Sequence, residues 1–407
     1  MGLADRSIIV IGAGIGGLAV ARALALRGAA VTLMEQAPEI TEVGAGIQIG
    51  PNGFAVLRGL GLERPFREGA RAAVQAKGVT LRDRHGLRVA RLRFDGMKRG
   101  EDYVFCHRAD LIDILADGAS AAGVRVMIDT EVTRVDTGPN PAVQTAKGRV
   151  IPADLIVCAD GLHSRMTPRL NPGSHPHYTG MVAWRAVVPG DEGPHIAQVF
   201  MGAGQHIVTY PLRGGKQRNI VAVQERHESM PENWNTHDDP ANMRAAFRDM
   251  GSRAQTLLSR IKEVHLWGLF RHPVAERWFS DGVVLLGDAA HPTLPFQAQG
   301  ASMALEDAWV LAEALDEVAD QNEALALYQE RREARVHRVI NAAEKNARRY
   351  HLSGPVGDMA HMGLRLVSAL APIALTSSFN WLYNHDVTGG QRLSGSGQAS
   401  RSTQTGT

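Results

Sequence analysis

SIIVIGAGIGGLAVARALALRG, residues 7–28, joins a short apolar run, a glycine-rich turn and a helical pattern. Gly12, Gly14 and Gly17 have the spacing G-x-G-x-x-G between a strand and a helix. The first glycine permits a tight turn, the second lets a diphosphate approach the backbone, and the third lets the helix pack closely on the strand. The N-terminus of that helix would also attract the diphosphate electrostatically. The stretch therefore predicts a dinucleotide-binding unit, with Gly28 as its helix cap.

The next apolar run, AAVTLMEQ, carries Glu35, which comes 23 positions after Gly12. An acid at this place accepts hydrogen bonds from a ribose diol, and this favours nucleotide binding over a glycine turn that serves packing alone. The same carboxylate would repel a 2′-phosphate. The spacing thus predicts FAD or NAD rather than NADP, and it leaves the choice between FAD and NAD open.

The composition is that of an ordinary globular protein, with 407 residues, 44% hydrophobic and 21% charged residues, and a net charge of +2. This balance gives no basic field for nucleic acid. The two cysteines make no disulfide framework, and no apolar run is long enough to span a membrane. We expect a cytoplasmic protein, monomer or homodimer, without nucleic-acid or membrane partners.

The rest of the chain predicts an α/β fold: a Rossmann-like domain with an inserted, mainly antiparallel β-sheet domain and a helical C-terminal segment. DLIVCADG (154–161) and DGVVLLGD (281–288) indicate buried parallel strands that end in acids. The β-type runs between them indicate the inserted sheet. The expected divisions are 1–70, 101–177 and 275–350 for the nucleotide-binding domain, 71–100 and 178–274 for the substrate domain, 351–390 for the C-terminal helices, and 391–407 for a disordered tail.

Three later motifs carry a resemblance to a known family. They are HRADL (107–111), CADGLHSR (158–165) and GDAAHPTLP (287–295). Together with the N-terminal fingerprint, they resemble the single-component FAD-dependent aromatic hydroxylases of the salicylate and hydroxybenzoate hydroxylase type. GAGIQIGPNG (44–53) is similar to the loop that these enzymes place against the flavin and ribose.

The resemblance implies FAD as the cofactor and NADH or NADPH as a transient co-substrate. Oxygen would form a flavin C4a-hydroperoxide that hydroxylates a small phenolic or hydroxy-acid substrate. The implied cofactor-binding residues are Gly12, Gly14, Gly17, Glu35, Gly46, Ile47, Arg108, Asp160, Gly161, Asp288, Gly300, Ala301 and Ser302.

Several of these residues have specific expected roles. Asp288 would accept hydrogen bonds from ribityl hydroxyls, and Arg108 would reach the ribityl–phosphate region, with an interdomain salt bridge as its alternative. Asp160 and Gly161 would lie where FAD and the pyridine nucleotide are both approached. Gly300 would begin a helix whose positive end stabilises the reduced flavin, with the N–H groups of Ala301 and Ser302 free to donate.

On the substrate side, HIVTYPL (206–212) predicts a strand with His206 and Tyr210 on one face. A neutral histidine there would remove the phenolic proton of the substrate, although a purely structural role is the alternative. The resemblance also places Pro295 beside the reactive edge of the flavin. Trp184 and Arg185 are further candidates for the pocket, with an ion pair on the surface as the alternative for Arg185.

The sequence also bears on the ring substrate, on a metal site and on alternative functions. Phe296 replaces the histidine expected after Pro295, which leaves the ring substrate open. His291 is expected to be structural, and a metal site is not expected because Asp288 and His291 lack a third ligand. The alternative functions are a flavin oxidase, epoxidase or dehydrogenase on the same fold, or a non-catalytic flavin redox sensor.

Overall fold

The computed structural model describes residues 3–40, 46–68, 73–94, 102–191, 193–232 and 236–393. Part of the segment 44–53 and most of the tail expected to be disordered lie outside these residues. The last described residue, Leu393, donates its backbone N–H to Gly59 at 2.8 Å. Within the described ranges, no helix combines the length and apolar character needed to cross a membrane.

A six-stranded sheet forms the base of the molecule, in the order β19-β20-β12-β1-β2-β8. Its strands are mostly parallel, and only the edge strand β19 is antiparallel to its neighbour. The bounds are β1 (Ser7–Ile11), β2 (Ala30–Met34), β8 (Arg125–Met127), β12 (Leu155–Cys158), β19 (Phe279–Ser280) and β20 (Val283–Leu285). The expected parallel strands in 154–161 and 281–288 are thus confirmed as neighbours.

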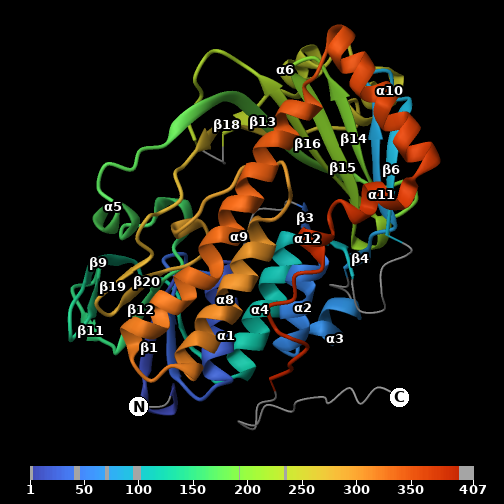
Figure 1. Cartoon of the computed structure of the whole chain (residues 1–407). Helices are drawn as coiled ribbons and strands as arrows, with labels where there is room; N and C mark the ends of the chain where they lie inside the picture. The colour runs from blue at the N-terminus through green and yellow to red at the C-terminus, as the bar shows by residue number, and fades with distance from the viewer. Residues whose placement is uncertain are drawn as a thin grey trace, which may run out of the picture.

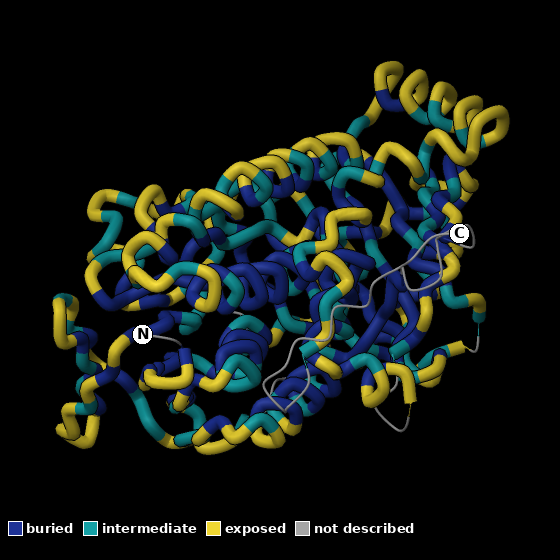
Figure 2. The backbone as a smooth tube through the Cα atoms, turned by 60° about the horizontal axis from the view of Figure 1, so that its bottom comes forward, coloured by how far each residue is buried: buried dark blue, intermediate teal, exposed yellow. Residues whose placement is uncertain are grey.

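Four helices pack together beside this sheet, as Figure 1 shows. They are α1 (Ile15–Ala25), α4 (Arg108–Ala121), α8 (Gly300–Glu317) and α9 (Gln321–Tyr350). A small antiparallel sheet of β9 (Val132–Asp136), β10 (Ala142–Thr145) and β11 (Val150–Pro152) lies near the β19 edge. Figure 2 shows the strands and inner helix faces buried and the outer helix turns exposed.

The second large sheet has eight strands in the order β17-β18-β13-β16-β15-β14-β5-β6, all antiparallel except the β14–β5 pair. Residues 178–274 therefore form the expected sheet, and two strands from before residue 95 join it. The bounds are β5 (Gly78–Arg82), β6 (Arg88–Arg93), β13 (His177–Pro189), β14 (Ile196–Gly202), β15 (Gln205–Leu212), β16 (Gln217–Glu225), β17 (His237–Asp238) and β18 (Val264–Arg271).

The two faces of this sheet meet different partners. One face packs against α6 (Pro240–Ala246) and α7 (Ser252–Leu258). The other faces α9 and the loop that precedes α8. Because side chains alternate along a strand, each residue of β13 and β15 faces either the helices α6 and α7 or the interior of the molecule.

Short elements join the two sheets and close the interior. The connecting sheet has the order β3-β7-β4, and α10 and α11 pack on β6. The bounds are β3 (Gly46–Ile49), β4 (Val74–Gln75), β7 (Val104–His107), α2 (Pro51–Gly59), α3 (Glu63–Arg67), α5 (Thr167–Leu170), α10 (Gly354–Leu370), α11 (Pro372–Ser377) and α12 (Asn380–Tyr383).

A buried charge cluster ties α8 and α9 to the turn that follows β20. Arg332 of α9 donates to Asp307 at 2.7 Å and to Glu306 at 2.6 Å, and all three side chains are fully buried. Asp307 also bonds His291 Nε2 at 2.6 Å. Burial acts to raise the pKa of Asp307, but His291 and Arg332 outweigh it and hold that pKa below its usual value. His291 therefore belongs to this buried cluster, and its structural role stays a prediction.

Replacing Arg332 by methionine tests this cluster. Arg332→Met leaves two buried carboxylates without their main cation, and we expect the free energy of unfolding to fall by about 3–5 kcal/mol. Chemical denaturation measures this loss. The matched control is Arg331→Met, which removes a half-exposed cation that pairs with Glu317 on the surface and should cost about 1 kcal/mol or less. Equal losses in the two variants would contradict the prediction.

Candidate functional site

The turn between β1 and α1 uses its glycines in two different ways. Gly12 has φ +96°, and a side chain there would collide with the backbone of Ala159. A side chain at Gly17 would collide with the carbonyl oxygen of Gly12. A Cβ at Gly14 meets nothing within 4 Å, and its φ of −73° suits any residue. Gly12 and Gly17 are therefore needed for packing, while Gly14 borders open space of the kind a diphosphate would occupy.

Glu35 closes the other side of this turn. It follows β2 directly, and its carboxylate accepts the N–H of Ala13 at 2.8 Å and of Ala37 at 2.9 Å. The acid thus lies against the glycine turn, where a ribose would be bound. Binding of the ribose itself by Glu35 stays a prediction.

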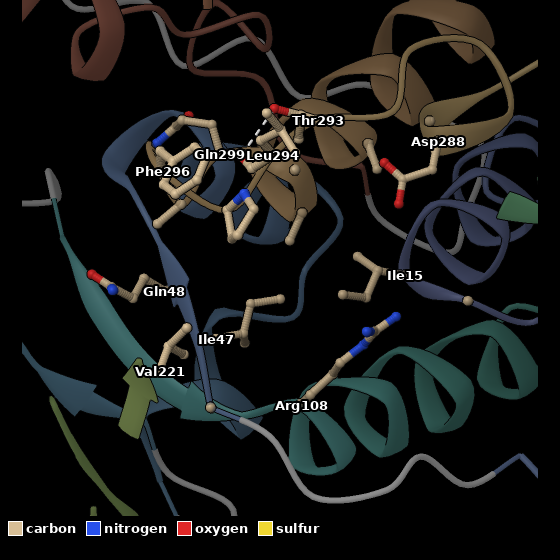
Figure 3. Close-up of a pocket in the computed structure, with 18 of the residues that line it drawn as sticks. Ile15, Ile47, Gln48, Arg108, Val221, Asp288, Thr293, Leu294, Phe296 and Gln299 are labelled. Carbon is tan, nitrogen blue, oxygen red and sulfur yellow. Dashed lines mark hydrogen bonds between the residues drawn. The ribbon is translucent and has the colours of Figure 1, made fainter. Parts of the chain in front are cut away.

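A pocket of about 270 Å³ opens beside this turn and brings together residues from far apart in the sequence. Figure 3 shows its walls, with Ile15, Ile47, Arg108, Asp288 and Phe296 around a common space. Eleven of the predicted site residues line it: Gly14, Gly46, Ile47, Arg108, Gly161, His206, Tyr210, Asp288, Pro295, Gly300 and Ala301.

Five predicted cofactor residues do not line this pocket: Gly12, Gly17, Glu35, Asp160 and Ser302. Asp160 accepts the N–H of Arg165 at 3.3 Å, and burial raises its pKa. Ser302 is buried, and its hydroxyl accepts the N–H of Gly50 at 3.4 Å. The side chain of Ser302 therefore supports the neighbouring α2 turn.

Asp288 and Arg108 extend into the same end of the pocket from different elements (Figure 3). Asp288 lies on the turn after β20, and Arg108 is the first residue of α4. The Asp288 carboxylate reaches the open pocket, yet the surrounding walls desolvate it and raise its pKa, while His291 and Arg108 oppose the rise. An acid and a guanidinium together fit hydroxyl and phosphate groups of a nucleotide chain.

Helix α8 begins at Gly300, with Gln299 as its N-cap residue. Gly300 and Ala301 line the pocket, so the positive end of the helix dipole is directed into it. This end suits an electron-rich ring such as the pyrimidine edge of a reduced flavin. Together with the open space at Gly14, this arrangement fits FAD.

Strand β15 supplies a row of side chains that faces this pocket. His206, Val208 and Tyr210 all line it, as period-two alternation requires. His206 is 1% exposed and bonds His351 through Nδ1 at 2.7 Å. Burial lowers the pKa of His206 well below its usual value, with a further contribution from His351. The imidazole is therefore neutral near physiological pH.

Alternation along β13 separates the two other substrate-side candidates. Arg185 lines the pocket, with its guanidinium 5.2 Å from the Trp267 ring centroid. Trp184 points to the opposite face, where it packs on Phe247 and donates to Asp238 at 2.7 Å. The suggestion that Trp184 lines the pocket is wrong because neighbouring residues of a strand face opposite sides.

A second cavity of about 570 Å³ continues from the first, between the eight-stranded sheet and the C-terminal helices. Its walls are mostly apolar, with Leu81 and Val199 from the sheet and Leu364 from α10. The two cavities share Gln48, His206, Val208, Pro295, Phe296 and Ala298. His206 and Pro295 thus lie where the first pocket meets a chamber of ligand size.

Sequence reasoning missed several residues around this chamber. Tyr103 donates its hydroxyl to Gln48 at 2.8 Å, and both side chains line the chamber. Tyr350 also lines it, and His351 contacts His206. His351 lies 145 positions from His206 in the sequence, and no motif connects them.

Comparisons with known proteins agree with this geometry. Residues 5–343 match the FAD binding domain family. The chain is 35% identical over 398 residues to a 3-hydroxybenzoate 6-hydroxylase of Polaromonas naphthalenivorans strain CJ2, covering 94% of this chain and 97% of the relative. It is also 34% identical over 363 residues to a 3-amino-4-hydroxybenzoate 2-monooxygenase of Streptomyces cremeus, covering 86% and 89%.

This chain belongs to the FAD-dependent aromatic hydroxylases. A solved salicylate hydroxylase substrate complex has the same fold, with a TM-score of 0.79, 25% identity and coverage of 95% of this chain and 97% of that chain. The hydroxylase is a flavoprotein monooxygenase that binds FAD and uses NAD(P)H as co-substrate. The predicted fold, cofactor and reaction class are confirmed.

The different tasks of Gly14 and Gly17 give a test of the cofactor site in this hydroxylase. Gly14→Val fills the open space, so we expect loss of most bound FAD while the thermal stability of the FAD-free protein stays near that of the wild type. Gly17→Val should destabilise the FAD-free protein itself because the added side chain meets backbone. Flavin absorbance and thermal denaturation without FAD measure the two effects. Full FAD content in Gly14→Val would contradict this assignment.

Proposed function

We propose that the hydroxylase acts on a small phenolic carboxylic acid, or on a hydroxylated heteroaromatic acid, with His206 as the base. The observation that carries the proposal is the position of His206, neutral and buried, where the cofactor pocket meets the apolar chamber. The relatives with hydroxybenzoate and aminohydroxybenzoate in their names support the same substrate class.

The residues of this chain prepare the substrate. His206 accepts the phenolic proton, which makes the ring electron-rich at the position to be hydroxylated. Burial raises the pKa of Tyr210, so its hydroxyl stays protonated and donates a hydrogen bond to the substrate. Arg185 adds positive charge to the same pocket, which favours an acid. Pro295 shapes the wall beside the ring, and the apolar chamber excludes water. FAD, when bound and reduced by NAD(P)H, would activate O2, which supplies the oxygen atom that is transferred to the ring.

The cofactor residues form a second part of the proposal. Gly14, Arg108 and Asp288 would bind the diphosphate and ribityl chain, and the N-terminus of α8 would face the ring. Gly12, Gly17, Glu35, Asp160 and Ser302 would support these groups from behind or bind the ribose. The oligomeric state, monomer or homodimer, and the cytoplasmic location stay predictions from the sequence.

A substrate screen tests the proposed class. NADH and NADPH oxidation by the FAD-loaded enzyme is measured with 3-hydroxybenzoate, salicylate, 3-amino-4-hydroxybenzoate and 6-hydroxynicotinate, and products are identified. We expect at least one acid to accelerate oxidation and to appear as a hydroxylated product. Hydrogen peroxide without a hydroxylated ring, for every acid, would contradict the proposal and favour an oxidase.

His206→Asn tests the base directly. We expect kcat/KM to fall by about 100-fold or more, since the general base is lost, while FAD content stays at the wild-type level. The control is His227→Asn, which changes an exposed histidine of the same region. Loss of FAD in His206→Asn would mean that His206 serves the structure instead.

The pH dependence of kcat/KM gives an independent check. The neutral form of His206 is the active base, and burial lowers its pKa, with His351 adding to this. Activity should therefore persist as the pH falls below about 6.5, the ordinary histidine value, and should drop only in more acidic solution. An acid limb centred at or above that value would contradict the assignment.

A further inference from the structure

Three titratable side chains form a continuous hydrogen-bonded row from the chamber to the surface. His206 Nδ1 bonds His351 Nε2 at 2.7 Å, and His351 Nδ1 bonds Glu225 Oε1 at 2.7 Å. We propose that His351 and Glu225 are positioning residues that fix the tautomer of His206 and conduct the substrate proton to solvent. This inference rests on the proposed function, in which His206 is the base.

The row is held by backbone as well as by side chains. His351 follows the last residue of α9, and its carbonyl oxygen accepts the N–H of Gly204 at 3.4 Å, in the turn between β14 and β15. Glu225 ends β16 and donates its own N–H to the carbonyl of Gly204 at 2.8 Å. One turn therefore fixes both partners of His206, which lies two residues beyond it. Figure 1 shows α9 passing the β14–β16 part of the sheet.

The carboxylate decides where each proton lies. A carboxylate only accepts, so a neutral His351 carries its proton on Nδ1, and its Nε2 is an acceptor. His206 must then donate from Nδ1, which leaves Nε2 of His206 without a proton. His206 lines both cavities, and its unprotonated nitrogen is the one left to meet a phenol. Glu225 thus makes His206 a base toward the substrate through two hydrogen bonds.

Burial decreases along the row. His206 is 1% exposed and His351 is 8% exposed, whereas the Glu225 side chain is 58% exposed. A proton that stayed on His206 would be a buried charge, which is costly. Transfer through His351 to the exposed Glu225 carboxylate would remove this charge from the interior.

The proton transfer balances without any oxidant or reductant. The phenolic O–H bond breaks and a new N–H bond forms at His206 Nε2. The Nδ1 proton of His206 passes to His351 Nε2, and the Nδ1 proton of His351 passes to the Glu225 carboxylate and then to water. The substrate is left as a phenolate, and both histidines are neutral but in the opposite tautomer, with His206 protonated on Nε2. The reverse transfer restores the base: a proton from solvent enters through Glu225 and His351, and His206 Nε2 returns its proton to the phenolate of the product.

Other titratable groups line the same two cavities as His206, among them Arg185 in the first and His361 in the second. Tyr350 has its ring centroid 5.2 Å from that of His206, and burial raises its pKa to about 12, so it stays neutral. Tyr210 lies on the same strand face, and Arg349 lines the chamber. Only His351 joins His206 to a carboxylate among the hydrogen bonds of the described residues.

Kinetics of the FAD-loaded enzyme provide the first test, with the active acid found among 3-hydroxybenzoate, salicylate, 3-amino-4-hydroxybenzoate and 6-hydroxynicotinate. We expect His351→Phe to lower kcat/KM at least about tenfold and to divert NADH oxidation from hydroxylated product to peroxide. Glu225→Ala should act in the same direction, and Glu225→Asp should recover part of the loss. The controls are His227→Phe and Glu228→Ala, at exposed positions beside Glu225.

The pH profile separates positioning from a general structural defect. Loss of the row should change the acid limb of kcat/KM in His351→Phe, because that limb reports the protonation of His206 and its partner. The proposal would be overturned if both His351→Phe and Glu225→Ala kept the wild-type kcat/KM, the wild-type acid limb of its pH profile and the wild-type share of NADH oxidation that yields hydroxylated product. This holds even if the enzyme hydroxylates the acid well.

The second test needs no turnover. Nitrogen-15 NMR of histidine-labelled, FAD-loaded enzyme near neutral pH reports which ring nitrogen of His206 carries the proton, with His206→Asn used for assignment. We expect a proton on Nδ1 in the wild type and a change of tautomer in His351→Phe. A proton on Nε2 of His206 in the wild type would overturn the proposal that His351 and Glu225 fix the tautomer of His206. If no acid in the panel is hydroxylated while the expected tautomer is found, the proposed function and the transfer of a substrate proton fail, whereas the fixing of the His206 tautomer by His351 and Glu225 stands.

Discussion

The salt bridge between Arg332 and Asp307 is the contact on which the site depends most. It joins α9 to α8 inside the protein, and Asp307 also bonds His291 in the turn after β20. That turn carries Asp288, and the loop after it carries Pro295. A buried ion pair costs much desolvation and is favourable only when every partner is bonded, so it fixes the three elements in one arrangement.

This arrangement places both ends of the two adjoining cavities. The start of α8 faces the cofactor pocket, while the far end of α9 brings Tyr350 and His351 to the eight-stranded sheet. Side chains of β15 alternate between the two faces of the sheet, so His206 and Tyr210 face the pocket while Ile207 packs toward α6 and α7. The proposed catalytic face is therefore made by two packed layers that are distant in sequence.

Short-range patterns predicted a large part of this protein. The glycine spacing predicted the β1–α1 turn, and the separate roles of Gly12, Gly14 and Gly17 agree with the space around each of them. The strands before Asp160 and Asp288 were also predictable, because apolar runs act locally, whereas the helix starting at Gly300 was expected from the family resemblance. His206 and Tyr210 shared a face because period two is a property of any strand.

The sequence by itself determined the dinucleotide fold and the inserted sheet, because these follow from glycine geometry and apolar periodicity. The tertiary structure alone decided which face of β13 looks inward, so that Arg185 enters the pocket and Trp184 does not. It also decided that His351 and Glu225 meet His206. Such contacts depend on how α9 and the sheet pack, and a sequence records no distance between residues that touch only after folding.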